Sequence, residues 1–185
     1  MRHALETLYA LSRGLAALFL ALILLTVLAQ VGLNVLDAVF EFFTGDAIGL
    51  LIPSYADFAG YFLATATFFA LAGSFRSGAH IRVTLFLVRL SEGPRRACEI
   101  FSAAIAFAFV SFFLVFAASL TAESWRFGDL SPGLVPIPIW IPQLAMTIGL
   151  AALGVATADS LVTFLRGGKA PYAEAEAEFR QLMEE

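Results

Sequence analysis

The chain has 185 residues, of which 60% are apolar or aromatic and only 14% are charged, and its mean hydropathy is +0.86. Soluble domains carry about 25% charged residues, so this composition argues against a soluble globular enzyme, and its hydrophobicity excludes a disordered chain. Cys98 is the only cysteine, so no internal disulfide can form. The net charge of −4 says less than the positions of the charged residues.

Four long stretches of the sequence contain no Asp, Glu, Lys or Arg. A helix crosses a hydrocarbon core of about 30 Å in about 20 residues, and each stretch is long enough to do so. None has the wide polar face of a helix in a soluble bundle. The sequence therefore predicts an all-α integral membrane protein whose four transmembrane helices lie at about 14–36, 57–75, 98–121 and 138–160.

The first of these stretches has an alternative interpretation as a cleaved signal peptide, with Val27-Leu28-Ala29 as the cleavage site. Its 23 apolar and uncharged residues exceed the roughly 7–15 of a signal peptide, which favours a retained span. Gln30 and Asn34 lie one turn apart near its end. We expect these two residues to form hydrogen bonds between helices, the commoner use of polar groups in a membrane.

The connections between the spans differ strongly in charge. Ten of the eleven basic residues fall on one side of the membrane and only Arg126 on the other. The positive-inside rule makes the basic side cytoplasmic and places both termini there. The opposite side then has an acidic loop at 37–56, whose short apolar run 48–52 is expected to lie on the membrane surface, and a proline-rich segment at 123–140. Trp125 and Trp140 are expected at the headgroup level of this outer face.

The connection between the second and third spans has its own pattern. Arg82 and Arg89 are seven residues apart and share one face of a helix, while apolar residues cover the rest. This pattern predicts an interfacial amphipathic helix at about 80–92, in the plane of the membrane. Gly93-Pro94 then ends it and begins the third span. The membrane domain is expected to cover residues 1–170, followed by a cytoplasmic tail at 171–185.

The spans lack the residues that most membrane chemistry requires. His3 and His80, the two histidines, both lie outside the spans, so no pair of haem ligands and no serine-protease set can form within the membrane. No charged residue marks an ion or proton route at the centre of a span. We therefore expect no enzyme activity, and no catalytic, substrate-binding or metal site in this chain.

Two segments carry a resemblance to a known family. They are the stretch Gly73–Val83, with the sequence GSFRSGAHIRV, and the stretch from Ser131 to Pro142, with the sequence SPGLVPIPIWIP. In their order within a four-span pattern, they resemble the DctQ-like small permease of tripartite ATP-independent periplasmic (TRAP) transporters. The resemblance covers about residues 10–165. Ala79 departs from the family, in which an acidic residue is frequent before the histidine.

The resemblance implies a scaffold subunit in the bacterial inner membrane. Its partners would be a large multi-span permease subunit, which holds the substrate and sodium sites, a periplasmic binding protein that delivers an organic acid, and membrane lipids, without nucleic acid. No cofactor is expected in this chain, and sodium is expected at the partner subunit. Two alternatives remain open: a non-catalytic anchor subunit of an enzyme complex, and a self-sufficient small channel or exporter.

The candidate contact residues fall into two groups. The cytoplasmic group is expected to contact lipid phosphates or partner carboxylates and comprises Arg76, His80, Arg82 and Arg89. The periplasmic group is expected to dock the binding protein and comprises Asp46, Trp125, Arg126, Asp129 and Trp140.

Overall fold

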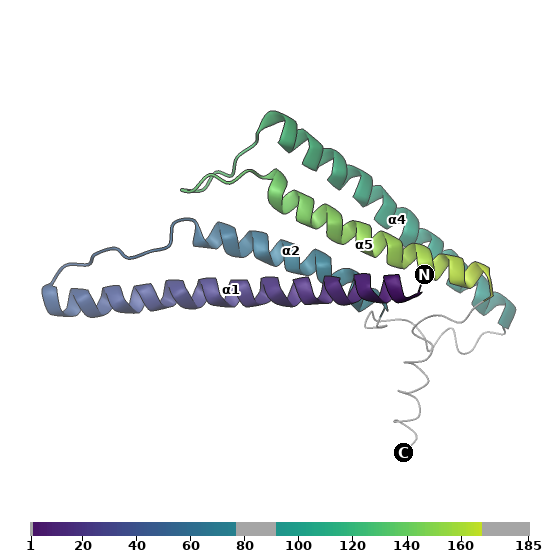
Figure 1. Ribbon diagram of the computed structural model, residues 1–185, viewed down its shortest axis with the longest axis horizontal. Coiled ribbons are helices and arrows are strands. Elements are labelled where there is room, and N and C mark those ends of the chain that lie inside the picture. The colour runs from purple at the N-terminus through teal and green to yellow at the C-terminus, as the bar shows by residue number, and fades with distance from the viewer. Residues whose placement is uncertain (1, 77–91, 168–185) are drawn as a thin grey trace, which may run out of the picture.

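The computed structural model describes residues 2–76 and 92–167 (Figure 1). Four helices make up most of these ranges: α1 (Arg2–Thr44), α2 (Tyr55–Arg76), α4 (Glu92–Phe127) and α5 (Trp140–Leu165). All four are long and apolar enough to cross a membrane, which confirms the predicted fold class. The tail at 171–185 lies outside the described residues. So does the interfacial helix expected at 80–92, except for Glu92, which is the first residue of α4.

The helices form a single row rather than a closed bundle. Helix α1 packs on α2, α2 on α5, and α5 on α4, and among the described helices α4 has no other extensive contact (Figure 1). The two edge helices are therefore poorly covered: 11% of the most apolar part of α1 and 6% of that of α4 are buried, against 44% for α5. A single layer of apolar helices leaves two broad faces to lipid or to another membrane protein.

The two ends of the row are named here by their residues. The arginine end contains Arg13 of α1, Arg96 of α4 and Arg166, which follows α5. The tryptophan end contains Trp125 near the end of α4 and Trp140 at the start of α5.

Helix α1 has a regular seam that packs on α2 and, from Gln30 onward, lies against the loop that follows α1. Between Tyr9 and Asp37, the buried and half-buried residues of α1, apart from Leu22, recur at alternating intervals of three and four. They are Tyr9, Ser12, Ala16, Phe19, Ile23, Thr26, Gln30, Leu33 and Asp37. This 3.5-residue period is the spacing of left-handed coiled-coil packing. The rings of Phe19 and Phe62 meet across the seam, with centroids 5.8 Å apart.

Three helices converge at the arginine end. Tyr9 of α1 is 2% exposed and packs against Ala72 of α2 and against Ala152 and Ala156 of α5. The three alanines leave room for one large ring between three backbones. Small side chains are the usual means of close helix approach in membranes.

Helices α2 and α5 approach most closely at Gly149. A Cβ atom there would lie 2.7–2.8 Å from the backbone of Phe68, so only glycine fits at this position. Gly154, one and a half turns further along α5, faces Val110 and Leu114 of α4 with room for a methyl group. The hydroxyl oxygens of Thr121 and Thr147 are 3.0 Å apart and form a hydrogen bond between α4 and α5.

The ends of α1 and α4 differ from the sequence-based expectation. The residues 37–44, expected as loop, are the last two turns of α1, because the half-buried Asp37 bonds to loop amides and the exposed Glu41 faces solvent, so that neither charge interrupts the helix. Gly45 ends α1 instead: it has a φ of 85°, and its N–H donates to the carbonyl of Glu41 (2.8 Å). Likewise α4 continues to Phe127 and is followed by Gly128 with a φ of 66°. The loop between α1 and α2 is therefore residues 45–54.

The close contact at Gly149 leads to a stability prediction. Gly149→Ala should lower the free energy of unfolding by about 1–3 kcal/mol, because its methyl group would overlap the Phe68 backbone. Gly154→Ala is the matched control and should be neutral or slightly stabilising, since its methyl group would lie 3.8–3.9 Å from its neighbours. Unfolding in detergent, followed by helix content, measures both variants. Equal stability of the two variants would contradict the assigned contact.

Candidate docking surface at the tryptophan end

The connection between α4 and α5 folds back on itself as a short hairpin. The N–H of Ile139 donates to the carbonyl of Asp129 (3.0 Å), and the N–H of Ser131 donates to the carbonyl of Ile137 (2.8 Å). Leu130 and Pro138 form an antiparallel bridge between these two bonds. Pro138 has no N–H to donate, so the flanking residues carry the hydrogen bonds.

Ser131 holds the inside of this hairpin. Its side chain is buried, with 5% of the residue exposed. The hydroxyl accepts a hydrogen bond from the N–H of Ile137 (3.0 Å) and donates to the carbonyl of Val135 (3.5 Å). A buried hydroxyl with both bonds made stabilises one conformation of the loop, because leaving its partners unpaired would cost about 1–3 kcal/mol.

The hairpin is attached to the start of α2. The N–H of Val135 donates to the hydroxyl of Ser54 (3.0 Å). Gly133 lies against the side chains of Ser54 and Asp57, and a Cβ atom at this glycine would overlap both. Ser54 has a φ of 57°, an unusual value for a residue other than glycine. These contacts join the two halves of the row at the tryptophan end.

Trp125 and Trp140 meet edge to face, with ring centroids 4.6 Å apart and an interplanar angle of 81°. Such aromatic pairs contribute about 0.5–1.5 kcal/mol beyond the area they bury. Trp125 remains 63% exposed. The sequence places both indoles at one membrane surface, and the structure adds that they form a single pair. That pairing has no sequence signal, because fifteen positions separate the two residues.

The predicted periplasmic residues fall into two places. Trp125, Arg126, Asp129 and Trp140 lie together at the base of the hairpin, where Arg126 and Asp129 are exposed. Asp46 is also exposed, but it belongs to the loop 45–54 at the far end of α1. The structure therefore brings four of the five candidates together and places the fifth on another loop.

Gln30 and Asn34 bond differently from the expectation. The amide Nε2 of Gln30 donates to Oδ1 of Asn34 within α1 (2.8 Å), and Oε1 of Gln30 accepts from the N–H of Ile52 (2.8 Å). Asp37 accepts two further loop amides, those of Ile48 and Gly49, at 2.8 and 2.9 Å. These are contacts from a helix to a loop, not between helices. The run 48–52 thus lies along α1, since its backbone donors need acceptors and α1 supplies them.

The hydrogen bond between Thr121 and Thr147 was not predicted from the sequence. Threonine in a membrane helix commonly bonds to its own backbone, and the two hydroxyls also lie 2.8 Å from the carbonyls of Ala117 and Gln143. Each hydroxyl has one proton, so one threonine donates to the other, and the accepting threonine donates to its own backbone. The sequence therefore offers no signal that distinguishes these two threonines from the others.

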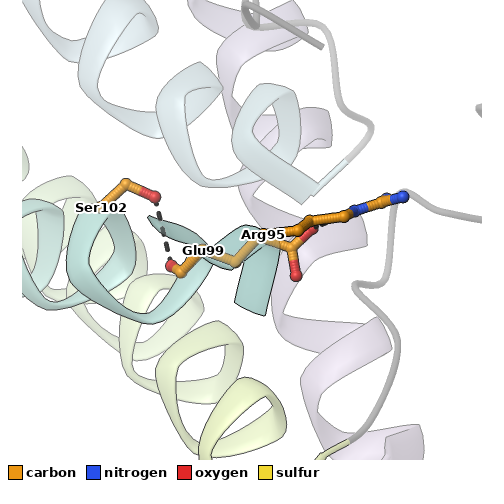
Figure 2. A network of polar contacts seen from close by, with 3 residues as sticks. All are labelled: Arg95, Glu99 and Ser102. Carbon is orange, nitrogen blue, oxygen red and sulfur yellow. Dashed lines mark hydrogen bonds and ion pairs between the residues drawn. The ribbon is translucent and has the colours of Figure 1, made fainter. Parts of the chain in front are cut away.

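The arginine end is described in part. Arg95 forms an ion pair with Glu99 (3.3 Å), and the hydroxyl of Ser102 donates to the Glu99 carbonyl (3.1 Å) (Figure 2). A surface pair one turn apart contributes only about 0.3–0.5 kcal/mol. Arg96 donates to the carbonyl of Leu165 at the end of α5 (3.4 Å). This bond gives a partner to one of the carbonyls that have none within the helix at that terminus.

Of the predicted cytoplasmic group, Arg76 is the last residue of α2, and the structure does not describe its side chain. His80, Arg82 and Arg89 lie outside the described residues. Within the ranges 2–76 and 92–167, no group of three or more His, Cys, Asp or Glu side chains is arranged to hold a metal ion.

Comparison with protein families identifies the family of this chain. The family model for the DctQ component of tripartite ATP-independent periplasmic transporters matches residues 48–167, about two thirds of the chain. The chain belongs to the DctQ family. The match includes α2, α4, α5 and the hairpin with its tryptophan pair, and it confirms the resemblance found in the sequence. A comparison with curated proteins finds no match.

Membership of the DctQ family makes this chain a component of a transporter. The matched range begins at Ile48, within the loop 45–54, so helix α1 precedes it. The matched range also contains both motif segments quoted above. The candidate docking surface of this DctQ chain thus lies in the part that it shares with its family, apart from Asp46.

The hairpin can be tested through its own fluorescence, because Trp125 and Trp140 are the only tryptophans. Ser131→Ala should lower the near-ultraviolet circular dichroism of the indole pair and shift its emission to longer wavelength, since the loop loses two hydrogen bonds. Ser102→Ala, a serine at the arginine end, is the matched control and should leave both spectra unchanged. Parental spectra for Ser131→Ala would show that its hydroxyl does not hold the pair.

Proposed function

We propose that this chain is the small scaffold subunit of a sodium-coupled secondary transporter, which imports an organic acid delivered by a periplasmic binding protein. Family membership supports the assignment to a TRAP transporter. Sodium coupling and an organic-acid cargo rest on the family resemblance alone. They would be properties of a large permease subunit and of the binding protein rather than of this chain.

The observation that carries the scaffold role is the single row of helices. The two edge helices α1 and α4 leave most of their apolar surface uncovered, and the central positions of all four spans lack charged residues. Transport sites in membranes commonly use intramembrane charges or broken helices. A layer of continuous apolar helices instead suits a partner-binding and membrane-anchoring role.

The orientation follows from the distribution of basic residues. With ten of eleven on one side, the arginine end would face the cytoplasm and the tryptophan end the periplasm, in the bacterial inner membrane. Arg76, His80, Arg82 and Arg89 would then lie near lipid phosphates or partner carboxylates on the cytoplasmic side. Each basic residue near an anionic surface contributes about 1 kcal/mol.

The binding protein would dock at the tryptophan end. The tryptophan pair and Arg126 supply residue types that are enriched in interface hot spots, and Asp129 and Asp46 supply negative charge around them. The hydroxyls of Ser131 and Ser54 accept hydrogen bonds from backbone N–H groups of the hairpin and keep it in one conformation before contact. A preorganised surface loses less entropy on binding.

The scaffold role predicts that uptake needs all components. Liposomes that hold only this chain should show no uptake under a sodium gradient. Liposomes that also hold the large subunit, supplied with the loaded binding protein outside, should accumulate the organic acid. The cargo to use is the acid that most raises the melting temperature of the binding protein. Uptake by the chain alone would contradict the proposal.

The docking surface predicts an effect of charge. Asp46→Lys combined with Asp129→Lys should slow uptake several-fold at limiting binding protein and low salt, because charges at the edge of an interface mainly steer encounter. Excess binding protein should restore much of the rate. Glu99→Lys, a charge reversal at the arginine end, is the control and should not alter the dependence on binding protein. Parental rates for the double variant at every concentration would exclude these two residues from docking.

A further inference from the structure

Helix α1 carries a second apolar seam that no described part of the chain covers. On the side of α1 turned away from α2, the positions from Leu11 to Phe42 that share one helix face, at intervals of three and four, are all exposed and all apolar or glycine. They are Leu11, Gly14, Leu18, Ala21, Leu25, Leu28, Gly32, Val35, Val39 and Phe42. This second seam has the same period as the one that packs on α2, so it has the geometry to receive another helix.

The glycines of this seam support that interpretation. A Cβ atom at Gly14 or Gly32 would meet nothing within 4 Å, so no contact with the described residues requires glycine there. Glycine inside a helix is unfavourable relative to alanine. Together with Ala21, the two glycines alternate with Leu and Val along the seam, which allows a second backbone to approach closely.

The same seam extends beyond the rest of the row. Arg13 lies against Gly73 at one end of the α1–α2 pair, and Gln30 bonds to Ile52 at the other, so the register of the two helices is known. The fourteen residues Val31–Thr44, called here the arm, lie past this second contact. At 1.5 Å per residue the arm is about 21 Å long. In Figure 1, α1 runs well past the start of α2.

The level at which the arm begins is close to the membrane surface. Asp57 lies in the first turn of α2, and the hairpin bonds to Ser54 just before that turn. The paired indoles of Trp125 and Trp140 lie at the base of the same hairpin, and such rings favour the headgroup level. The headgroup region adds only about 5–8 Å on each side of the hydrocarbon core.

Lipid therefore cannot cover the outer half of the arm. Phe42 is twelve residues past Gln30, so it lies about 18 Å further along the helix, beyond the headgroups even at an average tilt of about 20°. Yet Val39 is 48% exposed, Phe42 83% and Phe43 78%. Apolar side chains at this height need protein to cover them.

The inner part of the seam places a different requirement on the partner. Leu18, Leu25 and Leu28 lie within the charge-free span, where a soluble protein cannot reach them. A single occupant of the whole seam must cross the membrane and also continue outside it. A second copy of this chain fits poorly, because a parallel pair of α1 helices would bring Asp37, Glu41 and Asp46 of both copies together. No basic residue occurs between positions 14 and 75 to offset them.

We propose that the second seam of α1 binds a transmembrane helix of the large permease subunit, and that this helix continues outside the membrane along the arm with basic residues near Glu41. This inference rests on the proposed function and adds to it the helix, the face and the height of the contact. Helix α4 has a bare apolar face too, but it lies within the membrane span, where lipid is sufficient.

The test is photo-crosslinking from defined positions of α1 in the complex with the large subunit. A benzophenone amino acid replaces Leu25, Val35 or Phe42 on the seam, one at a time. Matched exposed positions on another side of α1 are Leu20, Val27 and Ala38. The seam positions should crosslink to the large subunit at least about five times more efficiently than the controls, at both membrane and arm heights.

Each other outcome overturns the inference. A band of twice the mass of this chain would mean a second copy, and a crosslink to the binding protein from Phe42 alone would mean a soluble partner. Lack of any protein crosslink from the seam would mean that lipid covers it. Crosslinks of equal strength from seam and control positions would mean that α1 has no preferred face.

A second measurement separates this inference from the proposed function. Val39→Ser with Phe42→Ser should reduce co-purification of the large subunit several-fold without affecting membrane insertion, because both residues lie beyond the span. Phe40→Ser is the matched control: it removes an exposed apolar side chain of the arm that is not part of the second seam, and it should leave co-purification unchanged. If the complex forms and transports but the first variant binds normally, the seam assignment fails while the scaffold role stands. If the parent chain never associates with a large subunit, the proposed function itself fails.

Discussion

The contact between α2 and α5 is the interaction on which the rest of the structure depends. Each of these helices pairs with its own edge helix, so the chain consists of two helical hairpins, and α2 and α5 join them. The join is made near the middle by Gly149 against the Phe68 backbone, at one end by the ring of Tyr9 among alanines, and at the other by Gly133 against Ser54 and Asp57. Small residues at these points replace apolar burial as the driving force, since lipid is as apolar as a leucine side chain.

The single row has a direct consequence for function. A bundle of four helices would hide most of its apolar surface, whereas a row exposes both faces and both edges. Such a chain adds width and anchoring to a larger membrane assembly, which agrees with its membership of the DctQ family. The tryptophan end adds a fixed hairpin to this layer, because the hairpin is bonded both internally and to Ser54 at the start of α2.

The sequence predicted features that depend on one segment alone, such as the apolar spans. It was less accurate for features that depend on contact with a segment distant in the sequence. The stretches without charged residues gave the number and approximate position of the helices. Each span must be apolar along its own length, because otherwise its transfer into lipid is unfavourable. The same signal misjudged the end of α1, since Asp37 can bond to loop amides and Glu41 can face water from a helix that continues to Thr44. It also misjudged Gln30, whose partner is a loop amide 22 positions away.

The sequence by itself determined the class of protein, its four apolar helices and the asymmetry of its basic residues, all of which depend on composition along one segment at a time. Only the tertiary structure decided the order α1, α2, α5, α4 and the pairing of Trp125 with Trp140. It alone also showed that the described residues leave one of the two seams of α1 uncovered. The physical reason is that α1 is apolar on most of its surface, and the seam that the chain covers, with Ser12, Thr26 and Gln30, is the less apolar of the two, so local hydrophobicity does not indicate which one the chain covers itself. That choice depends on the fit of Ala16 and Phe19 against α2, a contact between separate helices.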